Sequence, residues 1–326
     1  MRRRDLLAAL PALALAPVAA GRPARAAAAP LNVLAAPNAS SIVMARVMQT
    51  EPWQKAVPDS SFRLWRDTDE LRAGIVSGAT RLFTTPTHVP ALFANRGVPV
   101  RLLAITSMGH LYVVTDDPAI QTLADLKGRH LTNFFRNDMP DLTFRALLRR
   151  AGLEVGRDIN IDYVGTPMEA AQMLAAGRSH AAVLSEPPAT MAIMMAGKQG
   201  RTLHRALSLQ QEWGRLFGAP RIPMAGVALH QSLIESAPEV LAVLRAGLKP
   251  AAAWVPAHLA EAGALAEAKM DMRAEMFRAS LKYQNIEVQS ARAMQGELLA
   301  FYRALMEISP EAVGGRLPDD SLFLEL

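Results

Sequence analysis

The chain has 326 residues, 51% of them apolar, and its 35 lysines and arginines outnumber its 30 aspartates and glutamates for a net charge of +5. This length and apolar content exclude a disordered protein and allow one or two lobes with hydrophobic cores. Because the sequence contains no cysteine, a disulfide scaffold, a cysteine nucleophile, a thiolate metal site and a thioether lipid anchor are excluded.

The first 26 residues have the pattern of an export signal. Arg2–Arg4 precede an apolar run over residues 6–20 that is too short to span a membrane, and Ala24-Arg25-Ala26 offers small residues for cleavage. Arg3-Arg4 ahead of an apolar pair resembles the twin-arginine signal, with an ordinary Sec signal or a structural N-terminal helix as the alternatives. We therefore expect an exported protein.

The basic character of the chain belongs mostly to this segment. Residues 1–26 hold five arginines and one aspartate, which is +4 of the total of +5 and leaves about +1 for the remainder. The charge therefore gives no indication of nucleic-acid or anionic-membrane binding. Since no cysteine is present to carry a lipid, we expect a soluble, unanchored protein in a bacterial periplasm.

From Leu31 onward, short β-rich runs alternate with amphipathic stretches, which predicts an α/β fold built from βα units. The spacing of apolar residues predicts a helix over 42–48, and Asp69 and Glu70 behind Thr68 suit the positive end of another helix. In this half of the chain, strands are expected at 31–36, 62–66, 81–84, 100–105 and 111–115.

The clearest local pattern follows an expected strand at 159–164. Thr166-Pro167-Met168-Glu169 has the composition of a capping box with proline in the first turn, Gly177 suits the helix end, and 181–184 is the next strand. Beyond it we expect a helix over 203–216, a strand at 224–229, and helix over 232–306 interrupted at Pro238, Pro250 and Pro256. The helically spaced methionines at 191, 194 and 195 are expected to pack in the core.

Ligands bind open α/β sheets at the carboxyl ends of strands, so the residues after each strand are the candidates for a site. In this chain they are mostly serine, threonine and asparagine, which suit hydrogen bonding to a small solute better than bond breaking. They are Pro37–Ser40, Thr84–Thr87, Ser107–His110, Phe134–Asp138, Thr166 and Ser185–Pro187.

Several of these side chains also have a structural interpretation. Ser40 and Thr166 are expected foremost as helix caps, although a cap and an anion site use the same backbone groups. Arg136 could pair with an anionic ligand or could be a solvated loop residue. Glu186 could bind a cationic or hydroxyl-bearing group of a ligand, or it could cap the next helix. His110 is the best placed of the seven histidines.

Chemistry-bearing motifs are absent from the sequence. It has no GxGxxG after a strand, no P-loop, no HExxH, no GxSxG and no metal-spaced histidines. Acidic pairs such as Asp138 with Asp141 are expected to be solvated. No catalytic residue, metal site or cofactor is therefore predicted.

A series of segments in a fixed order carries a family resemblance. They are the opening strand through Pro37, Asp67-Thr68-Asp69-Glu70-Leu71 before Gly78, Thr122–Gly128 with its L-x-D-L-K-G pattern, Gly177–Pro187 and Gly314–Asp320. In this order they resemble the type II periplasmic solute-binding proteins of ABC transporters. The resemblance is closest to the nitrate, sulfonate, taurine and thiamine-precursor class.

The resemblance implies a two-lobe α/β fold, in which each lobe is a mixed, mostly parallel sheet flanked by helices and two hinge segments cross between the lobes. Residues 27–112 plus 225–326 would form the first lobe, and residues 113–224 the second. The family's contact positions fall on Asn38, Ser40, Thr85, Ser107, Phe135, Asn137 and Glu186. His110, Arg136 and Thr166, taken from the strand ends, complete the set of candidate ligand-binding residues.

The function that the resemblance implies is the substrate-binding component of an ABC importer. It would be a monomer that captures a small organic or anionic solute between the lobes and delivers it to permease and ATPase subunits, without catalysis. One alternative is a biosynthetic enzyme on the same scaffold, which would need a buried, charge-coupled titratable pair in the cleft. Another is a solute-sensing receptor for a different membrane partner. The sequence shows no arginine cluster of the kind that favours sulfonates, so the solute class stays open.

Overall fold

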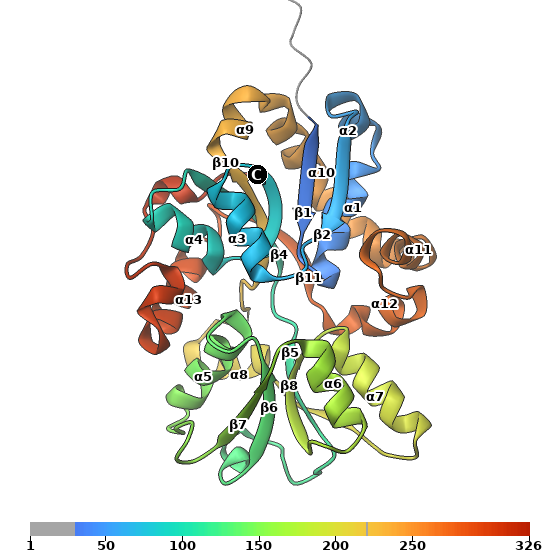
Figure 1. Ribbon diagram of the computed structural model, residues 1–326, viewed down its shortest axis with the longest axis vertical. Coiled ribbons are helices and arrows are strands. Elements are labelled where there is room, and N and C mark those ends of the chain that lie inside the picture. Colours follow the sequence, from blue (N-terminus) through green and yellow to red (C-terminus); the bar gives the residue numbers. More distant parts are fainter. Residues whose placement is uncertain (1–29, 220) are drawn as a thin grey trace, which may run out of the picture.

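The computed structural model describes residues 30–219 and 221–326, which form two lobes each built on one β-sheet (Figure 1). The expected export signal, residues 1–26, lies outside the described residues. The strand order is β11-β4-β10-β3-β1-β2 in the first lobe and β7-β6-β8-β5-β9 in the second. Both sheets are mixed and flanked by helices, so the predicted fold class is confirmed.

The first lobe has its parallel strands at one side of the sheet and its antiparallel strands at the other. The strands are β1 (Leu31–Ala35), β2 (Ser60–Leu64), β3 (Leu82–Pro86), β4 (Val100–Ser107), β10 (Ala225–His230) and β11 (Ile286–Ser290). β1 pairs in parallel with β2 and β3, whereas β10 pairs antiparallel with β3 and β4, and β11 with β4.

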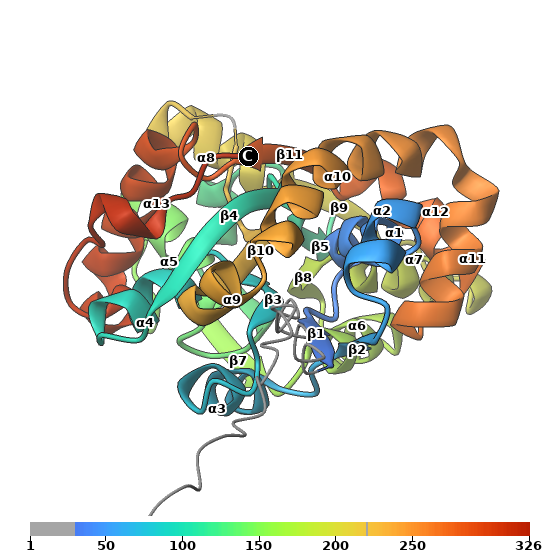
Figure 2. The same ribbon diagram turned by 90° about the horizontal axis from the view of Figure 1, so that it is seen from above.

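Helices cover both faces of this sheet, because successive strand residues are apolar on opposite sides. Val33 packs with one helix layer and Leu34 with the other. Figure 2 shows the two layers on opposite sides of β4. One layer is α1 (Ile42–Met48), α2 (Glu51–Ala56), α9 (Gln231–Ser236), α10 (Pro238–Ala257), α11 (Leu259–Met270) and α12 (Ala274–Ser280). The other is α3 (Thr68–Val76), α4 (His88–Asn95) and α13 (Gln295–Ile308).

The second lobe repeats the plan with shorter strands. They are β5 (Leu111–Thr115), β6 (His130–Phe134), β7 (Asn160–Val164), β8 (Ala181–Ser185) and β9 (His204–Ser208). Val113 faces α5 (Met139–Arg150) and α8 (Leu209–Phe217), whereas Val114 faces α6 (Pro167–Ala175) and α7 (Pro188–Lys198).

One hydrophobic core continues from the first lobe into the second. α13 of the first lobe packs on α5 of the second, and the Trp213 and Phe301 rings meet edge to face with centroids 5.5 Å apart. Burying a large apolar side chain stabilises a protein by about 1.5–3 kcal/mol, so this side of the molecule holds the lobes together firmly.

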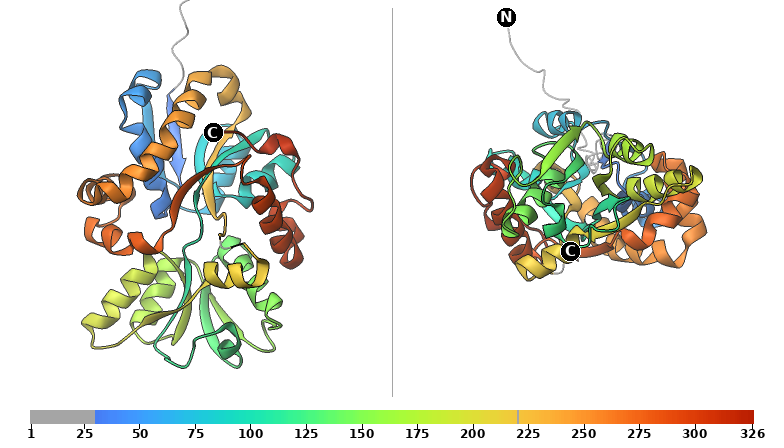
Figure 3. Two further views of the ribbon diagram at one scale, coloured as in Figure 1. Left: turned by 180° about the vertical axis from the view of Figure 1, so that it is seen from behind. Right: turned by 90° about the horizontal axis from the view of Figure 1, so that it is seen from below.

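Two chain segments cross between the lobes, as predicted, and Figure 3 shows both from behind. One joins β4 to β5 and the other leads from α8 into β10. They are hydrogen-bonded to each other, since the Ile222 N–H donates to the Met108 carbonyl (3.2 Å) and the Met224 N–H to the Ser107 carbonyl (3.0 Å).

The pairing registers place the carboxyl ends of the strands at this junction. In the first lobe, Pro86 and Ser107 both lie opposite Ala225, where the second crossing segment enters β10. In the second lobe, Ser185 lies opposite Leu111, where the first crossing segment enters β5. β1 runs parallel to β3, and β6 runs parallel to β8, so the carboxyl ends of these strands lie at one edge of each sheet. The two carboxyl edges therefore face each other across the crossings.

Three sequence predictions are wrong. Residues 204–208 form β9 rather than helix, because their partner β5 lies far away in the sequence and leaves no local signal. Residues 286–290 form β11, paired with β4, inside the stretch expected to be helical. In α7, Ala189, Ala192 and Ala196 pack fully into the core; Met191 packs against them as expected, whereas the half-buried Met194 and Met195 do not join the core.

The expected interruption at Pro250 is also wrong, whereas the chain does break before Pro238 and again directly after Ala257, one residue beyond Pro256. A proline inside a helix costs about 3 kcal/mol, because it removes an N–H donor and crowds the preceding turn. Here α10 continues through Pro250, held by a buried stripe that includes Leu244, Leu248 and Val255. Among the described residues, α10 is the one helix long and apolar enough to cross a membrane, and that stripe packs in the core of the first lobe.

Candidate functional site

Asn38 and Ser40 lie just after β1, at the edge that faces the second lobe. Asn38 caps a short 3-10 helix, and its Oδ1 accepts hydrogen bonds from the Ser40 N–H (3.1 Å) and the Ser40 hydroxyl (2.8 Å). The Thr106 hydroxyl of β4 in turn donates to Ser40 Oγ (3.3 Å). The two predicted residues are thus brought together, and local bonds fix their orientation.

Thr85 lies at the end of β3 and is completely buried. Its Oγ1 has no hydrogen-bond partner among the described residues, whereas Oγ1 of the preceding Thr84 bonds both the Ala36 N–H (2.7 Å) and the Ser41 hydroxyl (2.8 Å). Buried hydroxyls normally have partners, so a partnerless one at a strand end marks a place where a ligand atom can bind.

Ser107 and His110 bracket the first crossing segment. Ser107 Oγ and His110 Nδ1 are 2.8 Å apart, and both residues are buried. Burial lowers the pKa of His110 to about 4, because no neighbouring carboxylate compensates the charged imidazolium. The imidazole is therefore neutral at physiological pH, and its interaction with Ser107 is a hydrogen bond between uncharged groups.

Glu186 follows β8, and both of its oxygens are engaged within the second lobe. Oε1 accepts from Arg205 Nε (2.7 Å) and Nη2, and Oε2 accepts from the Thr190 N–H (3.2 Å) and hydroxyl (2.7 Å). Burial raises the pKa of Glu186 while Arg205 opposes the rise. Arg205 lies 3.6 Å from the ring centroid of Tyr283, which belongs to the C-terminal part of the chain. Glu186 thus anchors an arginine that links two distant segments.

The loop after β6 carries three of the predicted residues in an unusual backbone. Phe135 and Asn137 have positive φ angles of 49° and 62°, a conformation that side chains other than glycine adopt rarely and that is commonest at functional sites. Phe135 is half-buried against Phe134. Asn137 is exposed, as is Arg136, whose guanidinium lies 5.1 Å from the Tyr163 ring centroid.

Thr166 is exposed and caps α6, with its hydroxyl accepting from the Glu169 N–H at 3.1 Å. Glu169 reaches back to the Gly165 N–H (3.0 Å) rather than to the N–H of the cap residue. The predicted cap is confirmed, and its reciprocal bond is displaced by one residue.

No protein-family model matches the sequence, and no curated protein matches it. Solved structures do match. They include an ABC transporter protein from Parabacteroides distasonis, with TM-score 0.71, 21% identity and coverage of 90% of this chain and 98% of that one. The periplasmic aliphatic sulphonate binding protein SsuA from Escherichia coli matches with TM-score 0.66, 18% identity and coverage of 90% and 98%. The chain has the fold of the periplasmic binding proteins of ABC transporters.

Matches within this periplasmic-binding-protein fold extend to a nitrate binder. The periplasmic nitrate-binding protein NrtA from Synechocystis PCC 6803 matches with TM-score 0.57, 15% identity and coverage of 76% of this chain and 68% of that one. The fold suits a binding function, because its two lobes bring two carboxyl strand edges face to face.

A buried polar cluster links the two lobes of this periplasmic-binding-protein fold, and sequence reasoning missed it. Asp138 of the second lobe is 8% exposed, and its carboxylate lies 3.4 Å from Arg72 Nη2 and 3.4 Å from His88 Nε2 of the first lobe. The expectation that Asp138 and Asp141 are solvated is wrong, because Asp138 packs against the other lobe and Asp141 accepts from Tyr163 (2.8 Å) inside its own. Arg72 and His88 come from helices, which a search of strand ends does not cover.

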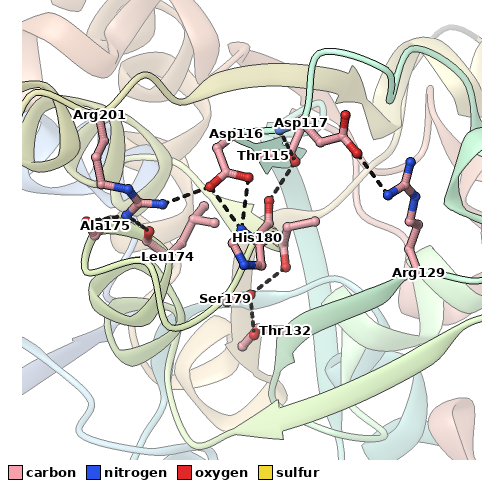
Figure 4. A network of polar contacts seen from close by, with 11 residues as sticks. Thr115, Asp116, Asp117, Arg129, Thr132, Leu174, Ala175, Ser179, His180 and Arg201 are labelled. Atoms are coloured by element: carbon pink, nitrogen blue, oxygen red, sulfur yellow. Dashed lines mark hydrogen bonds and ion pairs between the residues drawn. The ribbon is translucent and has the colours of Figure 1, made fainter.

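A second polar network lies at the opposite edge of the second lobe, away from the crossings (Figure 4). Asp116 follows β5 and lies 2.8 Å from Arg201 Nη2 and 3.1 Å from His180 Nδ1, and Arg129 Nη1 lies 3.0 Å from Asp117. Arg201 also donates to the carbonyls of Leu174 (3.0 Å) and Ala175 (2.8 Å) at the end of α6. These acidic groups are compensated by neighbouring cations, and the network fastens α6 to the sheet.

No metal centre is indicated by the described part of the chain. No group of three or more histidines, aspartates or glutamates lies close enough there to hold an ion.

Proposed function

We propose that the chain is the periplasmic substrate-binding component of an ABC importer that holds a small solute between its lobes. The observation that carries the proposal is the partnerless buried hydroxyl of Thr85, at the point where the two carboxyl edges oppose each other. We propose that the solute is also contacted by residues at the ends of other strands and in the first crossing, which are Asn38, Ser40, Ser107, His110, Phe135, Arg136, Asn137, Thr166 and Glu186. We propose the predicted lobes, residues 27–112 with 225–326 and residues 113–224, with Leu111 and Tyr112 moved to the second lobe because they belong to β5.

Binding of this kind is a ligand-driven shift of the population towards the closed arrangement of the lobes. The closed form would then present its solute to the permease and ATPase subunits. Matches to sulphonate-binding and nitrate-binding proteins support a small organic or anionic solute. The approximate neutrality of residues 27–326 fits a protein that works in solution and binds its partners specifically.

The decisive experiment is a thermal-shift screen of the purified chain against nitrate, alkanesulfonates, pyrimidines and aromatic acids. A solute at 100 times its Kd adds about 2.7 kcal/mol to the free energy of unfolding. Thr85→Val should reduce this stabilisation. Thr143→Val, which removes another partnerless buried hydroxyl, but inside α5, should leave it unchanged. No response to any compound would refute these solute classes, and equal behaviour of the two variants would remove Thr85 from the site.

Export is testable through the N-terminal sequence. Replacing Arg3 and Arg4 with lysine should retain the protein in the cytoplasm if the twin-arginine route carries it, because that route depends on the arginine pair. Unchanged recovery from the periplasm would assign the segment to the Sec route. A cytoplasmic location of the unaltered protein would contradict the proposed function.

One observation favours a second candidate, an enzyme on the same scaffold. Asp138 and His88 form a buried titratable pair between the lobes, which is the feature that the enzyme hypothesis requires. A purely structural ionic contact between the two lobes would have the same geometry, because Arg72 of the first lobe also lies against the Asp138 carboxylate. Mass spectrometry of each stabilising compound after prolonged incubation separates the two: recovery of the compound intact supports the binding protein, and conversion supports the enzyme.

A further inference from the structure

A cavity of about 500 Å³ lies at the edge of the second lobe opposite the crossings, beside the polar network of Figure 4. His130 opens β6 at this edge, Ala181 opens β8, and Asp116 follows β5; all three line the cavity. None of the residues proposed to contact the solute lines it. The cavity is therefore separate from the proposed solute site, and its volume is in the range of small-molecule pockets.

Two of the carboxylates that line this cavity are already paired with guanidinium groups. Asp116 lies 2.8 Å from Arg201 Nη2, and Asp117 lies 3.0 Å from Arg129 Nη1 (Figure 4). Each carboxylate thus has one arginine to balance its charge. These two pairs leave no net charge for a ligand.

Arg178 contributes a positive charge that no protein group balances. It is exposed on the cavity wall, and its side chain has no partner within residues 30–219 and 221–326. The preceding Gly177 has a φ of 73°, and a Cβ atom there would lie 3.0 Å from Arg201 Cζ. The turn that carries Arg178 therefore requires glycine, both for its backbone conformation and for the space beside it.

Asp162 of β7 contributes a negative charge to the same cavity, and its side chain is 75% exposed. The nearest ionisable nitrogen is His130 Nδ1, which lies 3.9 Å away, beyond hydrogen-bond distance. His130 Nε2 lies 3.2 Å from Asn160 Nδ2. Because an amide nitrogen only donates, Nε2 accepts this hydrogen bond, and the imidazole is neutral. Asp162 therefore has no cation to balance it.

The sheet holds these two unpaired charges apart. Thr132 of β6 pairs with Asp162 on one side and with Ala182 on the other, so the Cα atoms of Asp162 and Ala182 lie about 10 Å apart, two strand spacings. Arg178 precedes Ala182 by four residues and forms no ion pair with Asp162. Met173 is the one apolar side chain of this wall that is not fully buried. A ligand that contacts both charges therefore carries two opposite charges and little hydrocarbon.

We propose that this cavity is a second binding site, for a small zwitterion whose primary ammonium and carboxylate are joined by a short hydrocarbon chain. The ammonium binds the Asp162 carboxylate, the carboxylate binds the Arg178 guanidinium, and the chain lies against Met173. An amine or an acid alone would leave one of the two protein charges without a partner. The site lies within the second lobe and does not depend on the proposed function of the strand ends.

The test is a ligand-detected NMR titration of the purified full chain at pH 8, above the range in which histidine usually takes up a proton. The probes are β-alanine, γ-aminobutyrate and δ-aminovalerate, which differ in the spacing of their charges. Saturable binding of at least one is expected. The acid and the amine of the same length, which keep only one ion pair each, should bind at least about threefold more weakly. No binding by any of the three, or equal affinity for either analogue, would overturn the proposal.

Variants at exposed positions locate the binding without endangering the fold. Asp162→Asn and Arg178→Gln should each weaken the binding of the best zwitterion at least about threefold. Asp59→Asn and Arg303→Gln make the same changes at exposed positions of the first lobe, and Thr85→Val alters the strand-end site; all three should leave the affinity within about 1.5-fold. Full affinity in either cavity variant, or equal loss in Thr85→Val, would refute the site.

The same two variants also test the orientation of the ligand. In Asp162→Asn the zwitterion should lose its advantage over the acid of the same length, because both then keep only the contact with Arg178. In Arg178→Gln it should lose its advantage over the amine for the corresponding reason. An advantage retained in both variants would show that the ligand charges contact other groups and would contradict the proposal.

Discussion

Removing the Arg205 guanidinium tests the most strongly buried charge pair at the lobe junction. Glu186 is 1% exposed and the Arg205 side chain 15% exposed, so neither charge is well solvated. In Arg205→Met the Glu186 carboxylate loses two of its donors and keeps only the Thr190 N–H and hydroxyl. Breaking a buried ion pair by deleting one partner typically costs about 3–5 kcal/mol, and we expect a loss in that range at pH 8.

The loss should depend on pH, with a sign that follows from the pKa of Glu186. Burial already raises this pKa and Arg205 opposes the rise, so the variant should raise it further. An acid whose folded pKa exceeds its unfolded value binds a proton more tightly when folded. The penalty is therefore absent below the unfolded pKa of about 4.3 and grows as the pH rises to the folded pKa.

Urea denaturation of the wild type and the variant at pH 8 and pH 5 measures both effects. The difference in unfolding free energy should be smaller at pH 5. Adding Glu186→Gln to Arg205→Met should recover part of the loss at pH 8, because it removes the unpaired charge. A loss below about 1 kcal/mol at pH 8, or one that is equal at both pH values, would show that Glu186 and Arg205 do not depend on each other in this way.

Three further perturbations have distinct readouts. Because burial lowers the pKa of His110 from 6.5 to about 4, the unfolded chain alone binds this proton between those values, and stability should fall by about 1.4 kcal/mol per pH unit as the pH drops through them. His110→Gln should remove that slope, and a residual equal slope would contradict the assignment. Asp138→Asn keeps an N-cap acceptor for α5 but removes the charge facing Arg72 and His88, so X-ray scattering should show a larger radius of gyration without ligand. An unchanged radius would show that this cluster does not hold the lobes together. Thr166→Ala should cost about 1 kcal/mol of stability as a lost cap and should also weaken the solute response, because Thr166 is among the proposed contacts; an unchanged response would leave Thr166 with the capping role alone.

The parts of the fold that could be predicted are those determined by neighbours in sequence. The segment from β7 to β8 was correct because the Thr166 cap, the first-turn proline and Gly177 each act within a few residues. Gly177 has a φ of 73°, which glycine adopts without strain. β9 and β11 were missed because a short edge strand is defined by its partner, and their partners β5 and β4 precede them by about 90 and 180 residues.

The residues of the candidate site likewise fall into those that the sequence predicts and those that only the folded structure reveals. Asn38, Ser40 and Thr85 could be proposed, and their places at strand ends predicted, because the strands of an α/β sheet are visible in the sequence. Arg205 and His88 were missed because each acquires its partner only when distant segments meet: Glu186 for the first and Asp138 for the second. An arginine in a stretch predicted to be helical and a histidine that opens a helix look like ordinary surface residues. No pattern in one sequence distinguishes them.

The ionisation states at the lobe junction bear on how a solute is recognised there. The His110 imidazole is neutral above its pKa of about 4, Glu186 faces Arg205, and Asp138 faces Arg72. In each pair the negative charge of the carboxylate is balanced by the positive charge of the arginine. The net charge of these groups therefore stays almost constant across the neutral pH range. If the chain binds a solute there as proposed, recognition would depend largely on hydrogen bonds from hydroxyl and amide groups. Such bonds discriminate strongly, because an unmatched ligand leaves a buried group unpaired. For a solute that does not itself titrate, the affinity should therefore stay constant between pH 6 and pH 8, and a steep dependence there would place an uncompensated titrating group in contact with the solute.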